Sequence, residues 1–338
     1  MRRREPDIEN LFKVFRRERP ERATLFELFM NGIAYAQLAG REPDLSSDLA
    51  FLRFLVEAFA AGGYDYATTY ASNLTFSHAE KQRKGTVSMN EGFVITDEAS
   101  FDAYPWPDPE GFDDAKLEEI AKDLPGGMKL MIMGPGGVLE NTTELVGYEN
   151  MCVMLYDDPE LIGAVFDKVG SILLKYYQRA VQHDSVGFIC ANDDWGFNTQ
   201  TLIAPQDLRR YVFPWHKRIV QAAHDAGKPT ILHSCGNMGA IIDDIVDMGF
   251  DAKHSYEDVI LPVEDAYEAW HDRIAILGGM DVDFMVRRSE AEIDARCRAM
   301  LERTSQRGGY ALGTGNSVPD YLPVEKYLVM INAALDWA

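Results

Sequence analysis

The feature that most constrains the fold is an alternation of short apolar runs with longer segments that have helical spacing. The runs are nearly continuous in apolar residues, which is typical of parallel strands covered on both faces. The eight runs are residues 23–29, 64–70, 129–133, 187–192, 229–234, 250–255, 274–279 and 309–313. Eight strands alternating with helices in 338 residues predict an α/β fold, a (β/α)8 TIM barrel with an N-terminal helical extension. A doubly wound open sheet is the alternative.

Helix punctuation supports this alternation. Asp158 followed by Pro159 is a helix start, and Gly227 is a natural stop for a helix over 205–226. Further helices are expected over 238–248 and 289–306. We expect one domain over 1–338, in which the long, turn-rich segment 76–128 forms a lid or an insertion at the barrel mouth.

The charge balance limits the class of partner. The chain has 54 acidic and 33 basic residues, a formal net charge of −21. Such a field disfavours nucleic acid, anionic membranes and, unless a local basic pocket overrides it, a polyanionic substrate. No apolar run is long enough for a membrane span, and the basic N-terminus lacks a signal-peptide core. Four scattered cysteines fit a reducing cytoplasm, with Cys152 and Cys297 expected as inert core thiols.

Polar residues gather where the predicted strands end. The chemistry of a TIM barrel lies at the carboxyl ends of its strands, so these residues are expected to meet at one rim. The residues at these ends are Glu27, Asn73, Asn192, Asp193, Asp194, His233, Cys235, His254, Glu257, Asp281 and Asn316. Such groups are costly to bury unless they are paired or bind a metal.

His233 and Cys235 are the strongest indication of a metal site. They are two residues apart on an extended segment, so their side chains point the same way. Imidazole and thiolate are good zinc ligands, but a catalytic zinc needs about three protein ligands and an open position. The candidates for the third ligand are His254, Glu257, Cys190, Asp193 and Asn316.

Simpler readings exist for the neighbouring residues. Asp193 and Asp194 could cap the turn that follows them, although a functional role is favoured for Asp193. Trp195 fits either packing at the rim or stacking on a ligand. His216 and His224 lie on the helix after the fourth strand and are expected to be surface or satisfied helix residues.

The segments "DDWGF…LIAPQDLRRYVFPWHKRIVQAAHDAGKPTILHSCGNMGAIIDDIVDMGFDAKH", "ILGGMD" and "GGYALGTGNSVPDYLPVEKYLVM" resemble the uroporphyrinogen decarboxylase superfamily. The resemblance covers roughly 185–335 and implies a (β/α)8 barrel. It also implies one of two chemistries. The first is decarboxylation of uroporphyrinogen without a cofactor, and the second is methyl transfer by cobamide-dependent enzymes that use zinc to activate a thiol.

The His-x-Cys pair is similar to the methyl-transfer branch, which the chain resembles more than true uroporphyrinogen decarboxylase. In that branch a Cys near the end of the eighth strand completes the zinc site, whereas this chain has Asn316 there. The decarboxylase branch carries an Arg-Gln-Ala-Gly-Arg-like segment after the first strand. Gln37, Gly40 and Arg41 echo its composition, but not its order.

The sequence therefore predicts a zinc-dependent methyltransferase that moves a methyl group between a small substrate or thiol and a corrinoid on a separate protein. His233 and Cys235 would hold zinc, and Asp193 and Glu257 would be catalytic. The residues expected to bind substrate are Asn73, Asp194, Trp195, Asp281 and Asn316. The alternatives are a cofactor-independent decarboxylase of uroporphyrinogen or a related acid, and a non-catalytic barrel that binds a ligand.

Overall fold

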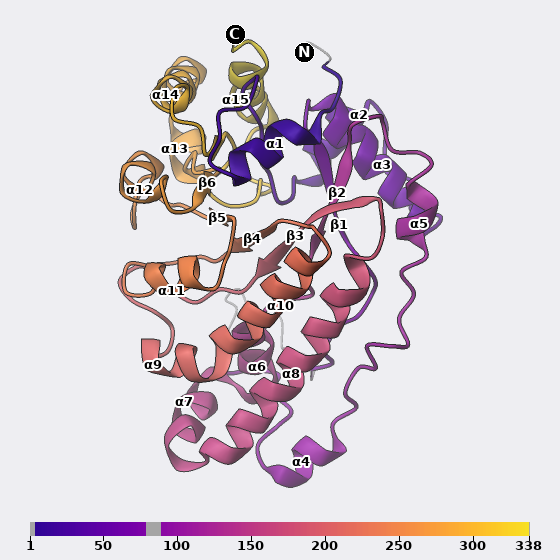
Figure 1. Cartoon of the computed structure of the whole chain (residues 1–338), viewed down its shortest axis with the longest axis vertical. Helices are drawn as coiled ribbons and strands as arrows, with labels where there is room; N and C mark the ends of the chain where they lie inside the picture. Colours follow the sequence, from indigo (N-terminus) through magenta and orange to yellow (C-terminus); the bar gives the residue numbers. More distant parts are fainter. Residues whose placement is uncertain (1–3, 79–88, 338) are drawn as a thin grey trace.

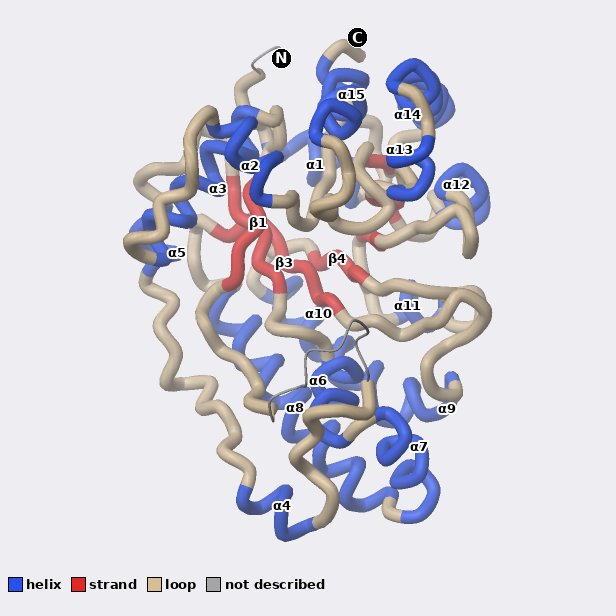
Figure 2. Tube along the Cα trace, turned by 180° about the vertical axis from the view of Figure 1, so that it is seen from behind, coloured by secondary structure: helices blue, strands red, loops and turns tan. Residues whose placement is uncertain are grey.

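Seven parallel strands form a single curved sheet, in which each strand pairs with its neighbours in the sequence, from β1 to β7 (Figure 2). The computed structural model describes residues 4–78 and 89–337. The strands are β1 (Tyr66–Tyr70), β2 (Lys129–Met133), β3 (Val186–Asn192), β4 (Thr230–His233), β5 (Ala252–His254), β6 (Ala275–Leu277) and β7 (Tyr310–Ala311). The register places His233 opposite both Asn192 and His254, which brings three strand ends together.

Helices connect the strands and surround the sheet (Figure 1). The N-terminal extension holds α1 (Ile8–Phe15), α2 (Gly32–Ala39) and α3 (Asp48–Ala61). The later helical elements are α4 (Glu98–Ala103), α5 (Lys116–Ile120), α6 (Val138–Val146), α7 (Tyr148–Asp157), α8 (Pro159–Ala180), α9 (Pro205–Asp207), the π-helical turn η1 (Leu208–Val212), α10 (Phe213–Asp225), α11 (Ile242–Asp247), α12 (Val263–Trp270), α13 (Val282–Arg287), α14 (Glu290–Thr304) and α15 (Val324–Leu335). None of the helices described is both long and apolar enough to cross a membrane.

Most of the predicted elements are confirmed. Seven of the eight apolar runs contain a strand, and β2 has the predicted bounds of 129–133. Helix α8 begins at Pro159, where the Asp158 side chain accepts a hydrogen bond from Leu161 N. The helix predicted over 238–248 is shorter, because only 242–247 is α-helical. The parallel α/β architecture that the alternation predicts is therefore present.

The first apolar run, 23–29, is the exception, because it forms only one isolated bridge, between Leu25 and Leu312. Phe26 N donates to Leu312 O on this side. On the other side, a side chain takes the place of a strand ladder: the Tyr66 hydroxyl accepts from Glu27 N at 2.7 Å and donates to Glu27 O at 2.6 Å. The prediction of a full strand here is wrong, because the hydroxyl of Tyr66 satisfies the main-chain groups that β1 would have paired.

The segment 76–128 lies partly outside the described residues, which exclude 79–88. Its described part packs on helices. The amide groups of Val94 and Ile95 donate to Leu145 O on α6, and Arg179 on α8 contacts Asp114 at 3.1 Å. A lid or insertion at the mouth stays a prediction.

The contact between the first run and the end of β7 leaves no room for a side chain. A Cβ built on Gly313 would lie 1.8 Å from Phe26 O, whereas a Cβ on Gly32 meets nothing within 4 Å. We expect Gly313→Ala to lower the free energy of unfolding by about 2 kcal/mol or more, because backbone must shift. Gly32→Ala is the matched control and should be close to neutral. Equal urea-unfolding midpoints for the two variants would contradict this packing.

Candidate metal centre and its surroundings

Three potential metal ligands from two neighbouring strand ends converge at the carboxyl edge of the sheet. Asp194 follows β3, His233 ends β4 and Cys235 follows it, and one donor atom from each lies within 4.8 Å of the others. His233 Nε2 is 3.7 Å from Cys235 Sγ and 3.9 Å from Asp194 Oδ1. Asp194 Oδ1 also accepts a 2.8 Å hydrogen bond from Cys235 N, which fixes the carboxylate beside the sulfur. The predicted pair therefore gains a third potential ligand.

A chain of hydrogen bonds sets the tautomer of His233. The carbonyl oxygen of Thr314 can only accept, so His254 Nε2, at 3.0 Å, carries a proton. His254 is fully buried and its pKa is lowered well below the usual value by burial, so its Nδ1 is unprotonated. That atom accepts from His233 Nδ1 at 2.9 Å. His233 Nε2 is then left with its lone pair toward Asp194 and Cys235, as a metal ligand requires.

Two polar side chains are directed at the sulfur of Cys235. Ser255 Oγ lies 3.5 Å from Cys235 Sγ, and Asn316 Nδ2 lies 3.4 Å from it. Burial, followed by the charge of Asp194, raises the pKa of the Cys235 thiol to about 12. Burial lowers the pKa of His233 to about 3. A neutral imidazole is ready to bind a metal, and a bound cation would reverse the preference of the thiol for its protonated form.

A buried carboxyl group contacts Thr314, the residue at which the hydrogen-bond chain to His233 starts. Glu27 is fully buried, and burial raises its pKa to about 8. Thr314 Oγ1 lies 2.8 Å from Glu27 Oε1 and 2.5 Å from Asn316 O, and it has only one proton to donate. Because Asn316 O can only accept, Thr314 donates to it and the protonated Glu27 donates to Thr314. Glu27 therefore fixes the residue whose carbonyl orients His254.

Asp193 does not reach the site, so its predicted contact with the reaction is corrected. Its side chain is fully buried, and its carboxylate accepts from Leu139 N at 3.0 Å, from Glu140 N at 2.9 Å and from His216 Nε2 at 2.9 Å. Asp193 thus caps α6 and ties it to α10. His216 was expected to be a surface or satisfied helix residue, and it is buried with its Nε2 paired to Asp193.

Trp195 is also corrected. Its ring is fully buried against Phe213 and His216, with ring centroids 5.1 and 5.0 Å apart, so it packs and does not face a ligand. Asn73 is exposed on the loop after β1. Its predicted role in substrate binding stays a prediction.

A cavity of about 600 Å³ opens at the carboxyl edge of β5 to β7 and contains three of the predicted site residues. Glu257, Asp281 and Asn316 line it, together with exposed Val259 and Tyr321. Asp281 is used structurally, because its Oδ1 accepts from Phe284 N and its Oδ2 from Asp258 N. Glu257 is half-buried, and burial, then Asp281 and Asp194, raise its pKa. Of these residues, Glu257 is the one best suited to exchange protons.

The sequence did not predict the third potential ligand, Asp194, or a neighbouring acid, Glu140. The candidates His254, Glu257, Cys190 and Asp193 lie outside the group of three, and Asn316 turns its amide nitrogen to the sulfur. Asp194 was predicted to bind substrate, although it lies two residues after the end of β3, as Cys235 lies two residues after the end of β4. Glu140, on α6, was not singled out. Burial, then the charges of Asp193 and Asp194, raise its pKa.

Comparisons with known proteins agree on one family. The sequence profile of uroporphyrinogen decarboxylase (URO-D) matches residues 107–337. Uroporphyrinogen decarboxylases from Citrifermentans bemidjiense and Myxococcus xanthus are 23% and 25% identical over 179 and 177 residues, which are 53% and 52% of this chain. These matches cover 50% and 48% of the relatives, so the chain spans about half the length of the curated relatives it matches.

Among solved structures, a methyltransferase from Methanosarcina mazei has a similar fold. Its TM-score is 0.76 at 16% sequence identity, and the alignment covers 98% of this chain and 99% of the other. At this identity the likeness shows the fold alone.

The state of Glu27 is testable through the pH dependence of stability. Because the pKa is about 8 in the folded chain and near 4.5 when unfolded, the folded state holds an extra proton between these values. The contribution of Glu27 to stability is therefore complete below pH 4.5 and is lost as pH rises through 8. Glu27→Gln, whose amide can donate to Thr314, should gain up to about 3 kcal/mol relative to the parent between pH 5.5 and 8.5.

The measurement is urea unfolding at both pH values, with Glu302→Gln, an exposed position on α14, as the control. If Glu27 were ionised and accepted from Thr314, Glu27→Gln would destabilise the chain equally at both pH values.

Proposed function

The chain belongs to the uroporphyrinogen decarboxylase family, and we propose that it is a zinc-dependent member that transfers a methyl group between a small substrate or thiol and a corrinoid on a separate protein. The observation that carries this proposal is the convergence of Asp194, His233 and Cys235 within 4.8 Å. We also propose that the 23–29 run closes the curved sheet into a (β/α)8 barrel, with the three ligands at its mouth. The bridge from Leu25 to Leu312 supports this closure.

The three side chains fit zinc in chemistry and spacing. Nitrogen, sulfur and oxygen donors are all common zinc ligands, and three protein ligands with an open fourth position are typical of catalytic sites. Bonds of about 2.0 to 2.3 Å put neighbouring ligands of a tetrahedral site roughly 3.5 Å apart. The separations of 3.7 and 3.9 Å from His233 Nε2 are close to this value. Zinc bound there would lower the pKa of a substrate thiol and hold it as a thiolate.

The residues around the ligands supply orientation and proton transfer. His254 keeps His233 in the tautomer that binds metal, and Asn316 and Ser255 donate to the sulfur of Cys235. Glu257 lines the 600 Å³ cavity, whose lining reaches Cys235 through Asn316, and it is the proposed acceptor of the proton that a substrate thiol releases. The cavity is large enough for a small substrate.

The proposed corrinoid partner would dock at the mouth. Exposed apolar side chains lie on the loops that follow three strands: Phe197 after β3, Val259 after β5 and Tyr321 after β7. Side chains of this kind are suited to a transient protein contact over the cavity.

Metal-free decarboxylation is the competing function, because the curated relatives are uroporphyrinogen decarboxylases. The charges around the mouth oppose it. Asp194, Glu257 and Asp281 lie at this edge, and carboxylates there repel a polyanionic substrate. A neutral or weakly charged substrate meets no such barrier.

Metal content tests the proposed site. The purified chain should bind one zinc ion, and His233→Ala, Cys235→Ser and Asp194→Asn should each lose it, as measured by elemental analysis and competition with a chromogenic chelator. His254→Leu keeps all three ligands but removes the tautomer lock, so it should weaken zinc binding by about 10- to 100-fold. Cys152 is exposed, contrary to the expectation of a core thiol, and Cys152→Ser is the matched control. A folded parent chain that binds no zinc would contradict the proposal.

Methyl transfer tests the reaction itself. With methylcobalamin and 2-mercaptoethanol as probes, the cobalt–methyl bond breaks, an S–CH3 bond forms and the thiol proton is released, so cob(I)alamin and a methyl thioether accumulate. We expect a catalysed rate, followed by absorbance and mass spectrometry, that His233→Ala and Cys235→Ser abolish and Cys152→Ser retains. Release of CO2 from uroporphyrinogen by zinc-free protein would favour the decarboxylase instead.

A further inference from the structure

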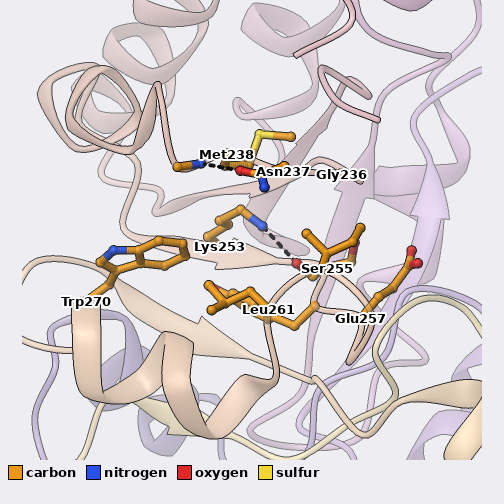
Figure 3. A pocket seen from close by; sticks show the side chains of 11 residues that line it. Gly236, Asn237, Met238, Lys253, Ser255, Glu257, Leu261 and Trp270 are labelled. Atoms are coloured by element: carbon orange, nitrogen blue, oxygen red, sulfur yellow. Dashed lines mark hydrogen bonds between the residues drawn. The ribbon is translucent and has the colours of Figure 1, made fainter. Parts of the chain in front are cut away.

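A second cavity, of about 220 Å³, lies beside the proposed metal centre (Figure 3). It is formed by the loop after β4, by β5 and the loop that follows it, and by the end of α12. Its lining residues include Asn237, Lys253, Ser255, Leu261 and Trp270. It shares the Ser255 segment with the surroundings of Cys235, and it shares Glu257 with the 600 Å³ cavity.

The cavity contains a buried cation. Lys253 is only 1% exposed. It precedes His254 on β5, so the two side chains point to opposite faces of the sheet. Its ammonium group donates to Ser255 O at 2.8 Å and to Ser234 O at 3.5 Å. In the described part of the chain, Lys253 forms no ion pair with a carboxylate. The charges of Asp194 and Glu257 act on Lys253 from beyond ion-pair distance, so an anion that enters the cavity can form the direct ion pair that these residues do not form.

The rest of the lining suits a small apolar body. Trp270 and Leu261 form one side of the cavity, with Ile260 and Tyr256 also in its lining. Asn237 Oδ1 accepts from Gly239 N, and its amide nitrogen is on the side of the cavity in Figure 3. The cavity thus combines two donors with an indole and aliphatic surface.

We propose that this cavity binds a small organic monoanion, whose carboxylate or sulfonate head pairs with Lys253 and whose flat apolar body packs against Trp270. The proposal is independent of the metal, because Ser255 presents its carbonyl to Lys253 and its hydroxyl to Cys235. The occupant would therefore press on the segment that donates to the sulfur without binding the metal itself.

The charge of the cavity limits the ligand to one negative group. Glu257 also lines it, and Figure 3 shows its carboxylate at the far end from Trp270. A second anionic group on the ligand would meet Glu257 and the net charge of −21 without a second cation to pair with. The preference for a monoanion follows from this arrangement.

The experiment titrates the full chain with benzoate and, in a second arm, benzenesulfonate, and follows tryptophan fluorescence and heat by calorimetry. Both probes test the same head-group chemistry, and the ratio of their dissociation constants distinguishes a site for carboxylates from one for sulfonates. Benzyl alcohol is the neutral analogue and terephthalate the dianion. We expect saturable binding of at least one monoanion, at least 10-fold weaker binding of benzyl alcohol and terephthalate, and loss of the fluorescence change in Trp270→Phe.

Lys253→Met should weaken binding of the monoanion at least 10-fold without changing the affinity for benzyl alcohol. Lys228→Met is the matched control, because Lys228 also donates to a backbone carbonyl, Val186 O, but lies outside the cavity. If Lys253→Met does not fold, Leu261→Trp fills the cavity with Lys253 intact and should abolish binding.

Cys235→Ser should still bind the monoanion, which separates this proposal from the metal site. Retained binding in folded Lys253→Met or Leu261→Trp, no saturable binding by the parent chain, or loss of binding in folded Cys235→Ser would each overturn the proposal.

Discussion

The arrangement of the site depends on one hydrogen-bond chain, from the Thr314 carbonyl through His254 to His233. Its acceptor end is a backbone oxygen that cannot donate, so the direction of every proton in it is set by the main chain after β7. His254 and His233 are both buried and neutral, so the Thr314 carbonyl determines which nitrogen of each ring carries the proton, as far as the end of β4. Because each link crosses from one strand end to another, the lone pair at His233 Nε2 depends on the register of the sheet and not on the local sequence around His233.

Glu27 extends the same constraint to the first apolar run, residues 23–29. Its carboxyl group has no cation beside it within its hydrogen-bonded set, which comprises Thr314 and Leu28 N. A carboxylate in such a place is expensive, and the group is more stable as a neutral acid that donates a proton. The first apolar run thus contributes a polar anchor for Thr314 where a regular strand was expected, and Tyr66 holds its backbone in place of a ladder.

The sequence was sufficient to predict the strands and helices that follow from local periodicity. It was insufficient to predict the features that depend on contacts between residues far apart in the chain. The buried run KLMIM and the Asp158–Pro159 helix start have local causes, so β2 and α8 were predicted closely. The run at 23–29 has the same composition as a strand, but whether its backbone finds a partner depends on a tyrosine about 40 residues away. In the same way, two adjacent aspartates make different contacts that the sequence does not reveal. Asp193 turns to the α6 amides and His216, whereas Asp194 turns to Cys235.

The proposed ligands also determine the charge of the site. In the proposed site the third donor is the Asp194 carboxylate, and Asp194 and a Cys235 thiolate together would offer two negative charges to a divalent ion. A substrate thiolate added at the open position would leave the whole group negative. Lys253 is buried, donates to Ser255 O and forms no direct ion pair with a carboxylate among the described residues, and its charge opposes that excess through a medium of low polarity. An anion bound at Lys253 would weaken this compensation, so its binding would act on the charge of the proposed metal site without contacting the ligands.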